Sequence, residues 1–133
     1  YLALYKDIID VKLALNGKVL KVIIEISQLN KNEIIKACEI CMDAKVDYIK
    51  TSTGFSNSGA TFTAVKIIKK TVKDHVKIIA AGDIQDYDTA LKYLQIGADR
   101  IGASKEIKIT KAQLKADIYS NIDWNPELLD LYF

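Results

Sequence analysis

The alternation of strand and helix patterns constrains the fold of this chain more than any other feature of its sequence. Apolar, β-branched segments predict strands, and apolar residues at helical spacing lie between them. The strand–helix units repeat at steps of roughly 25 to 30 residues, as in right-handed βαβ units that share one parallel sheet. The expected strands are 19–26, 46–50, 76–81 and 100–103, and the expected helices are 1–15, 30–45, 61–75, 86–97 and 110–119.

Local signals support these boundaries. Asn16-Gly17 is a natural helix stop, and Asn30 followed by Glu33 three residues later resembles a capping box. Asp86 is a favourable residue to precede a helix. The tail 121–133 carries the only proline and ends in Leu-Leu-Asp-Leu-Tyr-Phe, so we expect it either to dock its aromatic residues or to fray.

Size and charge restrict the domain organisation and the partners. The 133 residues, half of them hydrophobic, suffice for one core but not for two sizeable ones, so we expect a single α/β unit over 1–133. The formal net charge is only +2 and the lysines are scattered, which predicts no nucleic acid partner. No apolar run approaches the length of about 18 residues that a membrane helix needs, so we expect a cytoplasmic protein with no membrane partner. The chain begins with a tyrosine instead of methionine, which suggests a processed, truncated or partly observed chain.

Cys38 and Cys41 form a C-x-x-C spacing that has two interpretations. Such pairs can bind metal or carry out redox chemistry, but these two fall inside a helical pattern without a second pair, and His75 is the only histidine. We therefore interpret them as part of a buried helical face in a reducing compartment, and we expect no metal site.

Two architectures can accommodate alternating strands and helices. A doubly wound open sheet normally has a glycine-rich turn after its first strand, and residues 24–30 contain no glycine. A (β/α)₈ barrel places its chemistry at the carboxyl ends of its strands, and polar, glycine-bearing turns do follow the last three strands here. A complete barrel needs about 250 residues, so this chain would supply about half of one.

Lys50 is the candidate reactive residue. It ends an expected strand and is followed by the polar run Thr-Ser-Thr-Gly. A lysine beside an apolar strand is either a nucleophilic amine or a salt-bridged structural residue, and its position alone leaves both interpretations open.

The segment around Lys50 resembles the Schiff-base segment of deoxyribose-phosphate aldolases. The resemblance lies in Lys50-Thr51-Ser52-Thr53-Gly54-Phe55, the preceding residues 44–49 and the following Gly-Ala-Thr at 59–61. It extends from about Lys18 to Lys105 and includes Val-Ile-Ile-Glu at 22–25 and Gly-Ala-Asp-Arg-Ile-Gly-Ala-Ser at 97–104. This resemblance implies a class I aldolase with a TIM-barrel fold, of which the chain represents the second half, strands five to eight with their helices.

The resemblance also implies roles for individual residues. Lys50 would form an imine with an aldehyde, without a metal or other cofactor, and this reaction needs a neutral amine. Thr53, Gly82, Gly102 and Ser104 would orient a phosphorylated sugar, 2-deoxyribose 5-phosphate. The family's first half, which supplies an acidic residue to the proton relay, has no counterpart in the chain.

The chain departs from the family pattern near its third strand. Ile79 stands where the family has a second lysine, and Lys77, two residues and roughly 6 to 7 Å towards the bottom of the barrel, is not expected to replace it. Asp83 replaces the second glycine of the phosphate-binding turn, and Gln85 replaces a basic residue, although Lys105 could return some positive charge. We therefore expect impaired activity.

Two other interpretations stay open at this stage. The chain could be a weakly active or inactive aldolase-like protein that binds a protein partner, or a generic half-barrel with a solvated Lys50. Half a barrel would leave open edges on strands 19–26 and 100–103, which favours a homo-oligomer or another protein partner.

Overall fold

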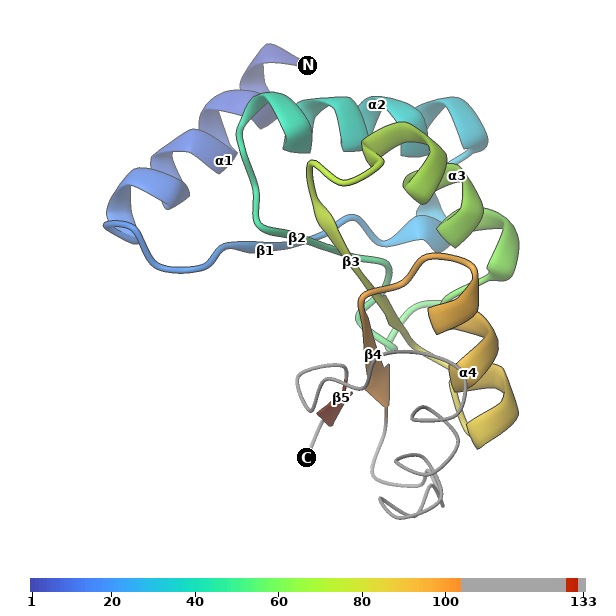
Figure 1. Cartoon of the computed structure of the whole chain (residues 1–133). Coiled ribbons are helices and arrows are strands. Elements are labelled where there is room, and N and C mark those ends of the chain that lie inside the picture. The colour runs from blue at the N-terminus through green and yellow to red at the C-terminus, as the bar shows by residue number, and fades with distance from the viewer. Residues whose placement is uncertain (104–128, 132–133) are drawn as a thin grey trace.

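The computed structural model describes residues 1–103 and 129–131, which form a single sheet with helices (Figure 1). In chain order the elements are α1 (Leu2–Ala14), β1 (Lys21–Ile23), the 3₁₀ helix η1 (Ile26–Gln28), α2 (Lys31–Asp43), β2 (Tyr48–Lys50), α3 (Phe62–Val72), β3 (Lys77–Ala81), α4 (Tyr87–Gln95), β4 (Arg100–Ala103) and β5 (Leu129–Leu131). Each strand and helix expected up to residue 103 is present, although β1 is shorter than the expected 19–26. The helix expected at 110–119 lies outside the described residues.

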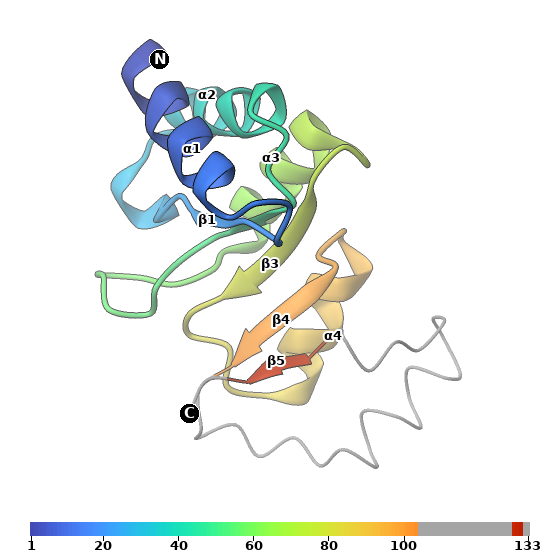
Figure 2. The same cartoon turned by 90° about the vertical axis from the view of Figure 1, so that its left-hand side faces the viewer.

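The order of the sheet decides between the two architectures. Its strands lie in sequence order, β1-β2-β3-β4-β5, and every neighbouring pair is parallel. A doubly wound sheet reverses its strand order at a switch point, whereas a barrel adds each strand beside the preceding one. The fold is thus α/β and corresponds to part of a barrel wall, as Figure 2 shows for β3, β4 and β5.

The two faces of the sheet have different surroundings. Helices α2, α3 and α4 cover the outer face, and the strand side chains beneath them, such as Ile49, Ile78 and Ile101, belong to the main hydrophobic core. Tyr48, Ile79 and Ala81 form a second, smaller cluster. Because side chains alternate along a strand, these three lie on the opposite, inner face. Lys50 has the same parity as Tyr48, so it lies on the inner face too.

Side-chain caps fix the start of each helix that covers the sheet. Asn30 and Glu33 form the expected capping box, with hydrogen bonds of 3.0 and 2.8 Å. Thr61 caps α3 by accepting from the Ala64 amide, and Asp86 caps α4 by accepting from the Thr89 amide. The bonds that Thr89 donates hold the pKa of Asp86 below its usual value.

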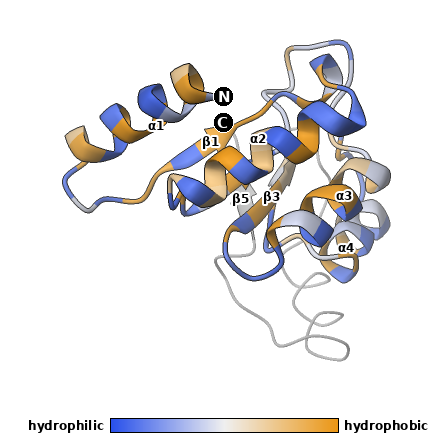
Figure 3. Ribbon diagram, turned by 90° about the horizontal axis from the view of Figure 1, so that it is seen from above, coloured by the Kyte–Doolittle hydropathy of each residue, from blue (hydrophilic) through white to orange (hydrophobic). Residues whose placement is uncertain are grey.

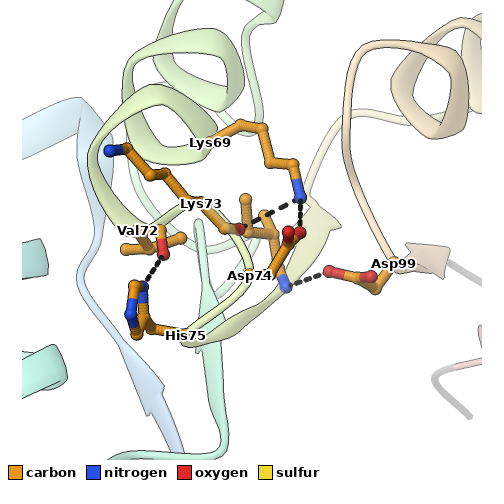
Figure 4. Close-up of polar contacts among 7 residues, drawn as sticks. Lys69, Val72, Lys73, Asp74, His75 and Asp99 are labelled. Atoms are coloured by element: carbon orange, nitrogen blue, oxygen red, sulfur yellow. Dashed lines mark hydrogen bonds and ion pairs between the residues drawn. The ribbon is translucent and has the colours of Figure 1, made fainter.

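Aspartate side chains also anchor the amino-terminal ends of two strands. Asp47, just before β2, accepts a hydrogen bond of 2.8 Å from the Leu20 amide, and Asp99, just before β4, accepts one of 2.8 Å from the Ile78 amide. Figure 4 shows the second of these beside the end of α3, where Lys69 pairs with Asp74. Each carboxylate binds the start of its strand to the preceding strand segment, and this bond fixes how the two strands align along the sheet.

Cys38 and Cys41 are buried on α2, at 0% and 1% exposure, which confirms their interpretation as part of a buried helical face. Desolvation by the surrounding core raises the pKa of Cys38 to about 12 and that of Cys41 to about 11. Both groups therefore remain thiols at neutral pH.

Helix α1 is much less buried than the others. Ile8 is its only buried residue, whereas Leu2 and Leu13 are 63% and 73% exposed. Figure 3 shows hydrophobic and hydrophilic residues alternating around this helix. Among the described residues, none of the helices is long and apolar enough to cross a membrane.

One expected edge is not open. Residues 100–103 were expected to be an unpaired edge strand, but β5 pairs with β4 in parallel, with Ile101, Gly102 and Ala103 opposite Leu129, Asp130 and Leu131. That expectation was wrong because the tail contains a short strand segment that adds to the sheet. On the other side, β2 is the only described strand that pairs with β1.

Candidate active site

Lys50 is the last residue of β2 and lies on the inner face of the sheet, where it is only 7% exposed. Its register partners are Ile23 on β1 and Ile79 on β3, and Ile79 is completely buried. The amine is thus carried on an inner face with an isoleucine on each neighbouring strand. Burial of an amine disfavours its charged form, which suits a nucleophile.

Thr51 fastens the carboxyl end of β2 to β3. Its buried hydroxyl donates to the Ala81 carbonyl at 2.9 Å and accepts from the Ala81 amide at 3.0 Å. Its carbonyl also accepts from the Ile26 amide, just beyond β1, at 3.0 Å. These bonds hold the ends of three strands together directly beside Lys50.

Thr53, in the loop after β2, is held by Glu25, a residue that the sequence did not place in the site. Its hydroxyl donates to Glu25 Oε2 at 2.6 Å, and its amide donates to Glu25 Oε1 at 3.2 Å. The same hydroxyl accepts from the Phe55 amide at 3.1 Å. Glu25 lies just after β1 in the left-handed region, at φ 48°. An acidic residue directly after an apolar strand is the signal that could have identified it.

Two loops meet at the carboxyl ends of β2 and β3. Gly59 and Gly82 are so close that a Cβ atom on Gly59 would lie 2.2 Å from the Gly82 carbonyl carbon. The Ala60 amide donates to the Ala81 carbonyl at 3.0 Å and is shared with the Gly82 carbonyl at 3.1 Å. Only glycine permits this approach of the two backbones.

Asp83 keeps a glycine-like backbone in the turn after β3. Gly82 has φ 88° and Asp83 has φ 58°, both in the left-handed region, which aspartate tolerates better than most residues. Its Oδ2 accepts a hydrogen bond of 2.9 Å from the Gly59 amide. The aspartate therefore also links the two loops, a role that the sequence did not indicate.

The structure brings together most of the expected site residues. Lys50, Thr53 and Gly82 lie at or just beyond the ends of β2 and β3, and Gly102 lies in β4 as the register partner of Ala81. Ser104 and Lys105 lie outside the described residues. Among the residues that the structure describes, no three His, Cys, Asp or Glu side chains gather where they could hold a metal ion.

Comparisons with known proteins identify similar chains. No model of a known protein family matches this chain. A deoxyribose-phosphate aldolase of Natranaerobius thermophilus is 54% identical over 97 residues, which are 73% of this chain and 44% of that protein.

Two solved structures resemble the fold. An aldolase named QR15 superposes with a TM-score of 0.78 at 41% identity, over 86% of this chain and 52% of that one. A tetrameric deoxyribose phosphate aldolase from Aeropyrum pernix superposes with a TM-score of 0.71 at 27% identity, over 88% of this chain and 49% of that one.

The chain spans about half the length of the curated relatives that it matches. Several proteins named deoxyribose-phosphate aldolase are 44% to 54% identical to the chain. Its sheet and helices also superpose on an aldolase structure, so sequence and structure indicate the same family. The chain belongs to the deoxyribose-phosphate aldolase family and represents part of its barrel.

Proposed function

We propose that the protein is a class I aldolase that cleaves 2-deoxyribose 5-phosphate to glyceraldehyde 3-phosphate and acetaldehyde. The observation that carries this proposal is the buried Lys50 at the carboxyl end of β2, in a chain whose relatives are named deoxyribose-phosphate aldolases. The names of these relatives support an enzyme and do not favour the alternative of a protein-interaction module.

The chemistry begins at the Lys50 amine. The neutral amine adds to the aldehyde carbon of the open-chain sugar to give a carbinolamine, and protonation of its hydroxyl followed by loss of water gives a protonated imine. A base removes the proton from the hydroxyl on C3, the bond between C2 and C3 breaks, and its electron pair moves into the imine to give an enamine. Glyceraldehyde 3-phosphate leaves at this step. Protonation of the enamine and hydrolysis of the resulting imine release acetaldehyde and restore the amine.

The other site residues position the substrate in this proposal. Thr53, Gly82, Gly102 and Ser104 orient the sugar and its phosphate at the carboxyl ends of the strands, where barrel enzymes carry their chemistry. The hydrogen bonds of Thr51, Glu25 and Asp83 support the proposal because they hold these loop segments in a fixed arrangement.

The assembly and location belong to the same proposal. Residues 1–133 act as one α/β unit within a barrel, in the cytoplasm, and the protein forms a homo-oligomer. The tetrameric structure of the Aeropyrum pernix aldolase supports an oligomer.

Borohydride trapping tests the function. The protein is incubated with 2-deoxyribose 5-phosphate, reduced with sodium borohydride, digested and analysed by mass spectrometry. We expect the added mass on the peptide that contains Lys50, and no adduct in Lys50→Ala. The matched control is Lys66→Ala, which removes an exposed lysine from α3 and should leave the adduct unchanged. An adduct that persists in Lys50→Ala would remove Lys50 from the role.

A further inference from the structure

The hydroxyl of Thr53 donates its only proton to Glu25. A threonine hydroxyl carries one proton and two lone pairs that can accept hydrogen bonds. Its contact with Glu25 Oε2 is 2.6 Å long, and a carboxylate oxygen only accepts, so the hydroxyl proton lies in this contact. The Phe55 amide donates to the same hydroxyl at 3.1 Å and occupies one lone pair. Within the described part of the chain, these bonds leave the Thr53 oxygen one lone pair and no proton for a ligand.

The backbone holds Glu25 in a conformation that few residues with a side chain adopt. Its φ of 48° and ψ of 67° lie in the left-handed region. The amides on either side of it, those of Ile24 and Ile26, donate to main-chain carbonyls at and just beyond the end of β2, at 3.1 and 3.0 Å. Its second carboxylate oxygen, Oε1, accepts from the Thr53 amide at 3.2 Å. Strain of this kind persists where the surrounding structure fixes a residue, and it is concentrated at functional sites.

We propose that Glu25 is a positioning residue that makes Thr53 select a hydroxyl group of the substrate. Because the Thr53 hydroxyl can only accept a further hydrogen bond, its ligand must donate one. The oxygens of an aldehyde and of a fully ionised phosphate only accept, whereas a sugar hydroxyl donates. The inference rests on the proposed function, in which Thr53 orients a phosphorylated sugar. It assigns Thr53 to the hydroxyl on C3 or C4 of that sugar and not to the phosphate.

The substitution Glu25→Gln reverses the direction of this hydrogen bond while it keeps the shape of the side chain. The Thr53 amide can only donate, so the single side-chain oxygen of the glutamine should face this amide, and its NH₂ group should face the Thr53 hydroxyl. The hydroxyl then accepts from the glutamine and from the Phe55 amide, and its proton becomes free for a ligand. The variant should therefore keep the loop in place but remove the preference of Thr53 for a donating group.

The experiment measures the binding of unreactive ligands, so it needs no turnover. Isothermal titration calorimetry on the whole protein gives the Kd of glycerol phosphate made by reduction of glyceraldehyde 3-phosphate, and of two analogues that each lack one of its two hydroxyl groups. These hydroxyls correspond to those on C3 and C4 of the sugar, and all three ligands carry the phosphate. We expect one analogue to bind about 3- to 10-fold more weakly than glycerol phosphate, the usual contribution of one hydrogen bond. The analogue that loses affinity identifies the hydroxyl that Thr53 binds.

Four variants separate the direction of the hydrogen bond from other effects. Glu25→Gln and Thr53→Val should both abolish the difference between the ligands, whereas Thr53→Ser should keep it because serine retains the hydroxyl. Asp83→Asn is the matched control, since it removes a carboxylate that binds the Gly59 amide instead of Thr53. Loss of this negative charge should strengthen the binding of all three phosphates equally and leave the ratio of their Kd values unchanged.

Three results would overturn the proposal for Glu25. They are equal Kd values or no measurable binding of the three ligands in the wild type, a preference that survives in a folded Glu25→Gln protein, and a preference that is lost in Asp83→Asn. Because none of these ligands forms an imine, a failure of the borohydride experiment alone would reject the aldolase reaction and leave the result for Glu25 standing.

Discussion

Lys50 and Ile79 are register partners at the centre of the site. The candidate reactive amine therefore has an apolar residue, and not a charged one, as its neighbour on β3. Ile79 is fully buried, so the position beside Lys50 on β3 is apolar and carries no charge. Just beyond this pair, the Thr51 hydroxyl binds both the amide and the carbonyl of Ala81. These two hydrogen bonds hold the ends of β2 and β3 together beside the amine.

A lysine at position 79 should increase activity. We expect Ile79→Lys together with Asp83→Gly to raise kcat/KM for 2-deoxyribose 5-phosphate by about 10²- to 10⁴-fold, the usual contribution of a group that tunes proton transfer. The φ of 58° at Asp83 suits glycine, although the substitution removes the bond to the Gly59 amide. Steady-state kinetics on both single variants and the double variant would separate the two effects. Ile79→Met, which adds no charge, should give no increase. A wild-type rate equal to that of ordinary family members would contradict the premise that the site is impaired.

The contact between Gly59 and Gly82 should tolerate no side chain. In Gly59→Ala the new Cβ would lie 2.2 Å from backbone, so the loops must separate, and we expect a loss of about 2 kcal/mol or more in the free energy of unfolding. Gly17→Ala is the matched control, because nothing lies within 4 Å of its Cβ and its φ of 84° should cost only about 1 kcal/mol. Urea unfolding of both variants measures the difference. Equal losses would show that the two loops are not packed as described.

At the scale of elements, periodicity predicted which segments form strands and helices, and capping residues predicted where helices begin. Strand ends were less predictable: 19–26 was expected, but β1 ends at Ile23 because Glu25 adopts a left-handed conformation and η1 follows. The contacts of Glu25 with Thr53 and of Asp83 with Gly59 were also missed. They join residues 28 and 24 positions apart, and no local pattern encodes such a pairing.

The packing of α2 predicts a specific pH dependence. The raised pKa values of Cys38 and Cys41 mean that the folded state keeps both thiols protonated above pH 9.0, while the unfolded chain ionises. The contribution of the protonated thiols to the free energy of unfolding is therefore fully present below pH 9. Above pH 9 it declines by about 1.4 kcal/mol per pH unit for each thiol.

Chemical denaturation between pH 8 and pH 10.5 tests this expectation for α2. A variant with Cys38→Ala and Cys41→Ala should be less stable at pH 8, because it loses packing, but its stability should fall less steeply above pH 9. Tyrosines ionise in the same range in both proteins, so the comparison of slopes isolates the thiols. Identical slopes would show that the thiols are not desolvated.

For the whole molecule, the described sheet ends in an outer strand on each side, β1 and β5. On one side β5 covers β4 and itself becomes the outer strand of the described sheet. On the other side β1 has β2 as its only described neighbour, and Ile23 and Val19 are 44% and 58% exposed. Unpaired parallel strands with apolar side chains promote association. The exposed apolar side chains at the β1 edge predict that contacts between chains form there.

Light scattering on the isolated 133-residue chain tests this prediction. We expect self-association that depends on concentration, and we expect Ile23→Lys to reduce it, because a charge on an edge strand opposes pairing with another edge. Phe55→Lys is the matched control: Phe55 is 97% exposed but lies in the loop after β2, so its replacement should leave the association unchanged. A monomer of 14.9 kDa that unfolds cooperatively would contradict the prediction, since the β1 edge would then need a cover within the chain itself. An equal effect of both variants would instead assign the association to general surface hydrophobicity and not to the strand edge.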